Sequence, residues 1–174
     1  QQAVGNVTSA LYKGATVYFL LRKESERKVP ELLEYWGTTK ARAIPVFGDL
    51  TSKKLGVAAD DIKGLKGSID ALFHLAAVYD LRADEETQIQ ANVEGTRNVV
   101  EFAKAIEAKH LHHVSSIAAA GLYEGVFRED MFDEAENLDH PYFNTKHESE
   151  KIVRKESKVP WTVYRPAFVV GDSQ

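Results

Sequence analysis

The 174-residue sequence contains no cysteine. Disulfide bonds, thiolate catalysis and thiolate metal sites are therefore excluded, and a reducing cytoplasm is the expected setting. No apolar run approaches the roughly 18 residues that a membrane-spanning helix needs, and no secretory signal opens the sequence. Charge of one sign is not concentrated either. The net charge is −4 and the basic residues are scattered, which argues against nucleic acid or an anionic membrane as the main partner.

The residues that are present suit one globular domain over 1–174, because 44% are hydrophobic and 28% are charged. Apolar, β-rich segments alternate with helical patterns, and no repeat or linker interrupts them. This alternation predicts an α/β fold with a doubly wound parallel sheet of the Rossmann type. The expected strands cover 15–21, 43–47, 69–75, 111–115 and 161–164, and the expected helices cover 1–14, 30–36, 55–65, 85–108 and 141–156.

Two of these strands have informative sequences. The first expected strand is continuously apolar from Ala15 to Leu21, as is typical of a strand buried on both faces. The second contains Pro45, which cannot donate a ladder hydrogen bond, so that strand should lie at a sheet edge.

Small and polar residues follow each expected strand. They are Arg22, Asp49, Ala76, Ser116 and Pro166. In parallel α/β sheets, ligands bind beyond the carboxyl ends of the strands. We therefore expect these residues to share one binding site.

Tyr142 and Lys146 are four residues apart, so on the helix expected there they share one face. A free phenol has a pKa near 10, and a lysine ammonium on the next turn would lower it, so that Tyr142 can act as a general acid toward a carbonyl oxygen. Ser116, at the end of the fourth strand, would hold that oxygen, whereas Ser115 points to the opposite face. The alternative is that Tyr142 and Lys146 form an ordinary surface pair.

Six motifs, in this order, resemble those of extended short-chain dehydrogenases/reductases. They are Gly48-Asp49-Leu50, His74-Leu75-Ala76-Ala77, Asn92-Val93-Glu94-Gly95-Thr96, Val114-Ser115-Ser116, Tyr142-x-x-x-Lys146 and Arg165-Pro166-x-x-Val169-x-Gly171. The segments 112–123, 127–150 and 159–173 resemble more narrowly the reductase domain of bacterial fatty acyl-CoA reductases. The resemblance implies catalytic roles for Ser116, Tyr142, Lys146 and Asn92. It also implies that Asn92 ties the long helix to the active-site strand, although an exposed mid-helix asparagine is the alternative.

The resemblance also implies a nicotinamide dinucleotide. Arg22 stands where an NAD enzyme usually places an acid, and an arginine suits a 2′-phosphate, so NADPH is preferred over NAD. Lys23 adds positive charge. The other expected contacts are Asp49 with the adenine amino group, Leu50 with the adenine ring, Lys146 with the nicotinamide ribose, and Ala76, Ala77 and Pro166 where the chain passes the cofactor. The alternatives are a solvated basic strand end, a Gly-Asp turn, and small residues packed in the core.

The family pattern begins with a strand and a G-x-x-G-x-x-G turn that cradles the pyrophosphate. Here only Gly5 could be the last of these glycines. We therefore expect a partial domain that lacks the first, central strand, the Gly-rich loop and the C-terminal substrate-binding part. The function would belong to a parent protein that can carry further domains, and a homodimer is compatible with the sequence.

Two other features are expected to be structural. His110 and His112 share a strand face and His113 points away, so no metal site is expected. The acidic run 129–139 should be a solvated loop near the mouth of the site, with a lid or a partner contact as alternatives.

The expected function is NADPH-dependent reduction of a fatty acyl-CoA thioester or fatty aldehyde to the aldehyde or alcohol. Two alternatives remain. One is another extended reductase activity, such as a nucleotide-sugar epimerase or dehydratase or another carbonyl reductase. The other is a non-catalytic NADP-binding sensor.

Overall fold

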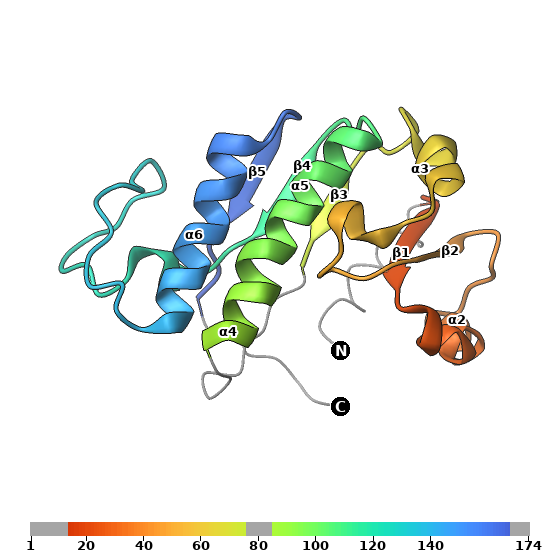
Figure 1. The fold of residues 1–174 in the computed structure, drawn as a ribbon, viewed down its shortest axis with the longest axis horizontal. Helices are drawn as coiled ribbons and strands as arrows, with labels where there is room; N and C mark the ends of the chain where they lie inside the picture. Colours follow the sequence, from red (N-terminus) through yellow and green to blue (C-terminus); the bar gives the residue numbers. More distant parts are fainter. Residues whose placement is uncertain (1–13, 76–84, 168–174) are drawn as a thin grey trace.

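The computed structural model describes residues 14–75, 85–167 (Figure 1). Its strands are β1 (Val17–Leu21), β2 (Ala43–Phe47), β3 (Leu72–His74), β4 (Leu111–Val114) and β5 (Trp161–Tyr164). The α-helices are α2 (Val29–Tyr35), α3 (Ala59–Leu65), α4 (Glu85–Gln88), α5 (Gly95–Ala105) and α6 (Pro141–Glu156). Short 3-10 helices are η1 (Lys23–Lys28), η2 (Lys53–Gly56) and η4 (Ile117–Ala120), and η3 (Ile89–Glu94) is a π-helix. This alternation of strands and helices confirms the predicted α/β class.

Every strand pairing in the described part of the chain is parallel. β1 pairs with β2, and β4 pairs with β3 on one side and β5 on the other, so the strands form a two-stranded and a three-stranded sheet. β2 has β1 as its strand partner in the described residues, which agrees with the edge position predicted from Pro45. Helices α5 and α6 lie side by side against the β3-β4-β5 sheet (Figure 1).

The main core lies between these helices and the sheet. It contains residues of α5, α6 and β4, together with Leu55, Val57 and Leu65 from the segment after β2. A second core packs α2 against the β1-β2 sheet, where the rings of Phe19 and Trp36 meet edge to face at 5.0 Å. Leu50, which follows β2, packs against the main core, and its carbonyl accepts a 2.9 Å hydrogen bond from Asn98 of α5.

The prediction that the first strand is buried on both faces is wrong. Tyr18 is 42% exposed and Leu20 is 41% exposed, whereas Val17, Phe19 and Leu21 pack against the second core. Successive strand residues face opposite sides of a sheet, so β1 is covered on one side and open on the other among the described residues.

Three other predicted elements differ from the structure. The expected helix 85–108 is divided by the π-helix η3, and its last α-helical residue is Ala105. The expected helix 55–65 begins only at Ala59, because Leu55 has a φ of 60°, in the left-handed region. The third strand is shorter than predicted, at Leu72–His74. The expected helix 1–14 lies outside the described residues except for Gly14.

Candidate active site

The start of α6 places Tyr142 and Lys146. Pro141 is the first helical residue, where its missing N–H costs nothing, and the His140 side chain caps the helix by accepting a 3.1 Å hydrogen bond from the Tyr142 N–H. His140 is therefore the N-cap of α6. Tyr142 lies in the first turn of the helix, and Lys146 follows one turn later on the same face.

Lys146 is buried, with 1% of its surface exposed, and its Nζ donates a 3.1 Å hydrogen bond to the Val114 carbonyl at the end of β4. Burial lowers the pKa of Lys146 to about 8, and the Glu150 carboxylate opposes this decrease. Two buried histidines face the ammonium, His74 on β3 and His113 on β4. The pKa of each is lowered chiefly by burial and also by the charge of Lys146. The surface-pair alternative therefore does not fit Lys146.

Tyr142 is half-buried, and its ring lies 6.3 Å from the Phe143 ring. No hydrogen bond joins its hydroxyl to Lys146 or Ser116, all of which lie in the described part of the chain.

The two neighbouring serines differ in exposure. Ser115 is 1% exposed, and its hydroxyl has no hydrogen bond of good geometry, although it helps to lower the pKa of Glu150. Ser116 is half-buried and caps η4, its Oγ accepting a 3.1 Å hydrogen bond from the Ala118 N–H. The adjacent Ile117 N–H donates to the Pro166 carbonyl at 3.2 Å, so the ends of β4 and β5 lie together. Ser116 is accordingly the more exposed of the two serines, and it lies just after the carboxyl end of β4.

Asn92 lies in the π-helix and is 2% exposed, which excludes the exposed mid-helix alternative. Its amide donates a 3.2 Å hydrogen bond to the Thr145 hydroxyl, so the tie from the long helix reaches α6, next to Lys146. The Thr96 hydroxyl donates to the Asn92 carbonyl at 2.6 Å and lies 2.9 Å from His74 Nε2. Because Thr96 has one proton to give, His74 must donate through Nε2. The π-helix thus joins α6 to β3, and π-helical turns are frequent at functional sites.

Arg22 and Asp49, from the ends of β1 and β2, form an ion pair in which Arg22 Nε lies 3.0 Å from Asp49 Oδ2. The other Asp49 oxygen accepts hydrogen bonds from the N–H and hydroxyl of Thr51, and these bonds, aided by Arg22, lower the pKa of Asp49. The Gly-Asp turn that was the alternative for Asp49 is therefore present. Lys23 pairs with Glu26 at 2.7 Å and lies 4.3 Å from the centre of the Phe47 ring.

Of the remaining predicted cofactor contacts, Leu50 and Pro166 lie in the described residues and Ala76 and Ala77 do not. The Leu50 side chain packs against α5 so closely that a Cβ at Gly95 would lie 2.8 Å from Leu50 Cγ, which explains the glycine in this motif. Pro166 is half-buried beside η4. Ala76 and Ala77, like Val169 and Gly171, lie outside the described residues.

The histidines lie on the two faces of β4. The rings of His110 and His112 are 4.6 Å apart on one face, while His113 is buried on the other with neither ring nitrogen hydrogen-bonded. Within residues 14–75, 85–167, no three metal-ligating side chains gather at one point. The same residues contain no helix that is both long and apolar enough to cross a bilayer.

Comparison with known proteins identifies the family of the chain. The model of an NAD-binding family described as "Male sterility protein" matches residues 10–174. The chain belongs to this family. Its fold is that of the extended short-chain dehydrogenases/reductases, as the sequence motifs predicted.

Relatives of this chain include a peptide synthetase and a putative fatty acyl-CoA reductase. The chain is 31% identical over 175 residues to a subunit of the linear gramicidin synthase of Brevibacillus parabrevis, covering 92% of the chain and 3% of that protein. It is 26% identical over 198 residues to the putative fatty acyl-CoA reductase CG8306 of Drosophila melanogaster, covering 90% of the chain and 38% of that protein.

Among solved structures, the terminal R domain of the myxalamid PKS-NRPS biosynthetic pathway superposes with a TM-score of 0.79 at 28% identity. The match covers 98% of the chain and 48% of that structure. The chain thus spans less than half the length of each of these three relatives.

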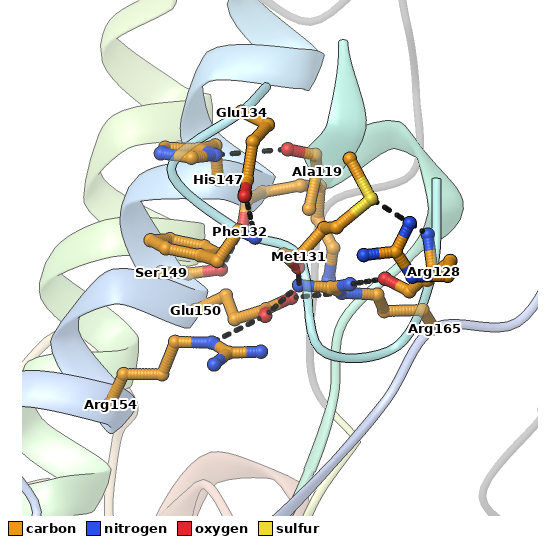
Figure 2. Close-up of polar contacts among 11 residues, drawn as sticks. Ala119, Arg128, Met131, Phe132, Glu134, His147, Ser149, Glu150, Arg154 and Arg165 are labelled. Carbon is orange, nitrogen blue, oxygen red and sulfur yellow. Dashed lines mark hydrogen bonds and ion pairs between the residues drawn. The ribbon is translucent and has the colours of Figure 1, made fainter. Parts of the chain in front are cut away.

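One group of residues behind the site was not predicted from the sequence. Glu150, one turn after Lys146, is fully buried and paired with Arg165, and Arg165 in turn holds the loop that precedes α6 (Figure 2). This loop is also less solvated than predicted, because Met131 and Phe132 are buried within the acidic run. The available signal was the spacing of Tyr142, Lys146 and Glu150, which places a carboxylate below the lysine on one helix face.

Proposed function

We propose that this male sterility family domain is part of an NADPH-dependent reductase that acts on a thioester or aldehyde carbonyl, with a fatty acyl-CoA or fatty aldehyde as the substrate. The observation that supports this most is the position of Lys146. A buried ammonium whose pKa is about 8 lies one turn from Tyr142 and is bonded to the end of the strand that carries Ser116. Perturbed groups that meet at a strand end are typical of catalytic sites.

In this proposal Ser116, Tyr142 and Lys146 have different roles at the carbonyl oxygen. Ser116 holds the oxygen by a hydrogen bond, and Tyr142 donates a proton to it as it gains charge. Lys146 favours the phenolate that remains on Tyr142. Asn92 positions α6 through Thr145. NADPH, when bound, supplies the hydride.

The residues at the ends of β1 and β2 fit the adenosine end of NADPH. Arg22 offers a guanidinium that is 60% exposed and can bond a 2′-phosphate bidentately, and Lys23 adds positive charge. Asp49 would accept from the adenine amino group, with Leu50, Ala76, Ala77 and Pro166 beside the cofactor. An acidic residue in place of Arg22 would have suited NAD instead.

Thioester reduction balances in two steps. Hydride adds to the thioester carbon and a proton to its oxygen, giving a thiohemiacetal that expels the thiol and leaves the aldehyde. A second hydride and proton give the alcohol. The chemistry is the same whether the thiol is coenzyme A or the arm of a carrier domain.

The likeness to the linear gramicidin synthase and to the myxalamid R domain favours a second candidate, in which the acyl group is carried on a synthetase. The name of the Drosophila relative favours the acyl-CoA. A parent protein with further domains fits either substrate.

The test is oxidation of NADPH by the full-length protein with a long-chain acyl-CoA, the matching N-acetylcysteamine thioester, or the fatty aldehyde. We expect turnover with at least one of these, and a decrease of about 100-fold or more in Tyr142→Phe. Tyr35→Phe is the matched control, because Tyr35 is 72% exposed on α2. Absence of turnover with all three, or turnover unchanged in Tyr142→Phe, would refute the proposal. Retention of tightly bound NAD without net NADPH oxidation would point to an epimerase instead.

A further inference from the structure

Glu150 is a fully buried carboxylate on the same face of α6 as the two proposed catalytic side chains. Tyr142, Lys146, Glu150 and Arg154 follow one another at intervals of four residues, so they form one ridge of the helix. Glu150 has none of its surface exposed. A buried charge is tolerated only when it is paired and hydrogen-bonded, so the partners of Glu150 show what it does.

Two arginines bind Glu150 from different elements. Arg165, which follows β5, donates from Nε to Oε2 at 3.0 Å and from a terminal nitrogen to Oε1 at 2.6 Å. Arg154, one turn further along α6, donates to Oε1 at 2.7 Å. Burial alone would raise the pKa of Glu150, but the hydrogen bonds from Arg165 and Arg154 outweigh it and lower the pKa. The carboxylate is therefore charged, and Arg165 holds it in a two-point, forked geometry.

Arg165 also binds the loop 121–136. Its guanidinium donates to the Met131 carbonyl at 2.9 Å and to the Arg128 carbonyl at 3.4 Å (Figure 2). It also lies 5.1 Å from the Phe127 ring. Glu150 fixes the guanidinium, and the guanidinium fixes the loop backbone.

The same loop is held at two further places. At its base, Gly121 and Glu136 form a β-bridge, with the Leu122 N–H donating to the Glu136 carbonyl at 2.8 Å. In its middle, the buried Phe132 ring stacks on His147 at 4.2 Å and lies 4.7 Å from the Arg154 guanidinium. Beyond the base, the loop is therefore attached to α6 and to Arg165, and Glu150 is bonded to both of the arginines that take part.

We propose that Glu150 is a positioning residue that holds the loop 121–136 against α6 through Arg165 and, on the same ridge, supports the charged form of Lys146. The first role stands on the contacts above. The second rests on the proposed reductase function, in which Lys146 acts as a cation.

The charges around Lys146 determine the direction in which Glu150 shifts its pKa. Glu150 faces it from α6 and raises its pKa, while burial lowers it. His74 from β3 and His113 from β4 face it as neutral rings, because their own pKa values are lowered. Glu150 is thus the negative group that faces Lys146 on this ridge, and its carboxylate also carries the guanidinium groups of Arg154 and Arg165. Its removal would leave those positive charges uncompensated, so the deprotonation of Lys146 should move to a pH below about 8.

The test compares Glu150→Gln, Arg165→Lys and the control Glu148→Gln in the full-length protein. Glu148 lies on the same helix, is 39% exposed and pairs with Lys151, so its variant should behave as wild type. Hydrogen exchange of residues 128–132 should accelerate about tenfold or more in Glu150→Gln. Arg165→Lys should accelerate it as well, because a lysine lacks the fork that binds Glu150 and the two carbonyls together.

The pH profile of turnover separates the two roles. The alkaline limb of kcat should shift to lower pH in Glu150→Gln and stay near the wild-type position in Arg165→Lys, which keeps the carboxylate. If Glu150→Gln loses protection from hydrogen exchange throughout α5, the variant does not fold. The exchange of residues 128–132 in Arg165→Lys then tests the role of Glu150 in holding the loop. Wild-type exchange at 128–132 in both variants would overturn the inference, whatever the turnover. An unshifted alkaline limb in Glu150→Gln would overturn the role at Lys146, and absence of turnover in the wild type would remove the proposed function and that role together.

Discussion

Replacing Lys146 with methionine should stabilise the protein at neutral pH while abolishing the proposed reductase activity. Burial lowers the pKa of Lys146 from 10.5 to about 8, which means that the folded state penalises the ammonium relative to the unfolded state. At pH 7 this difference amounts to about 3 kcal/mol. Loss of the hydrogen bond from Nζ to the Val114 carbonyl destabilises the variant by about 1 kcal/mol. The net gain in the free energy of unfolding of Lys146→Met should therefore be about 2 kcal/mol.

A substitution in the core usually lowers the free energy of unfolding, whereas Lys146→Met is expected to raise it. The size of this gain depends on pH. The penalty on the wild type is fully present below about pH 8 and declines as the pH rises toward 10.5, where the unfolded chain also loses its proton. At pH 10 the penalty should be about 1 kcal/mol, and the two proteins should then be equally stable.

The assay is urea unfolding of Lys146→Met and wild type at both pH values, with the free energy of unfolding obtained by linear extrapolation. Lys151→Met is the control, since Lys151 pairs with Glu148 at the surface and should change stability by about 0.5 kcal/mol or less. A variant that is less stable than wild type at pH 7, or a gain that does not shrink at pH 10, would refute this account of Lys146.

Three further predictions concern other parts of the site and fold. Arg22→Ala should weaken binding of 2′,5′-ADP about tenfold or more and leave ADP binding unchanged in calorimetry; equal losses for both would contradict a 2′-phosphate role. Gly121→Ala should cost about 2 kcal/mol or more in chemical denaturation, because Gly121 has a φ of +65° and a Cβ there would collide with the Glu136 carbonyl, whereas Gly64→Ala in the open interior of α3 should stabilise slightly. Asn92→Ala should destabilise by about 1 kcal/mol or more and lower turnover, and a double-mutant cycle with Thr145→Val should show coupling; additive effects would contradict the contact.

Elements with strong local signals could be predicted closely from the sequence. The bounds of α6 follow from Pro141 and the capping residue before it, and those of β5 follow from a short apolar run, and both match the structure. The parallel pairing of the strands follows from their alternation with helices. Tertiary contacts decided the elements that differ. Leu55 is drawn into the core through a left-handed backbone, and helical periodicity alone does not reveal a π-helix at Asn92.

The candidate site was also predicted only in part from the sequence. The motifs identified residues that the structure brings to the ends of β1, β2, β4 and the start of α6, including the Arg22–Asp49 pair. The burial of Lys146 was not apparent, because its Nζ is bonded to a carbonyl 32 residues away in the chain. The network of Glu150, Arg165 and the loop was missed for the same reason. Charged residues in a polar stretch are typical of a solvated surface, and only the fold shows that Glu150 has no contact with water.

The central claim is that Tyr142, Lys146 and Ser116 together serve the reduction of a carbonyl by NADPH. The most direct measurement is a single-turnover reaction of the full-length protein with NADPH and an acyl thioester or the fatty aldehyde, following the loss of NADPH and the appearance of aldehyde and alcohol together. In the wild type we predict that the loss of NADPH equals the aldehyde formed plus twice the alcohol formed, and in Tyr142→Phe we predict a slower reaction at unchanged NADPH affinity. No product from the wild type with either the thioester or the fatty aldehyde, or an equal rate in Tyr142→Phe, would contradict the claim.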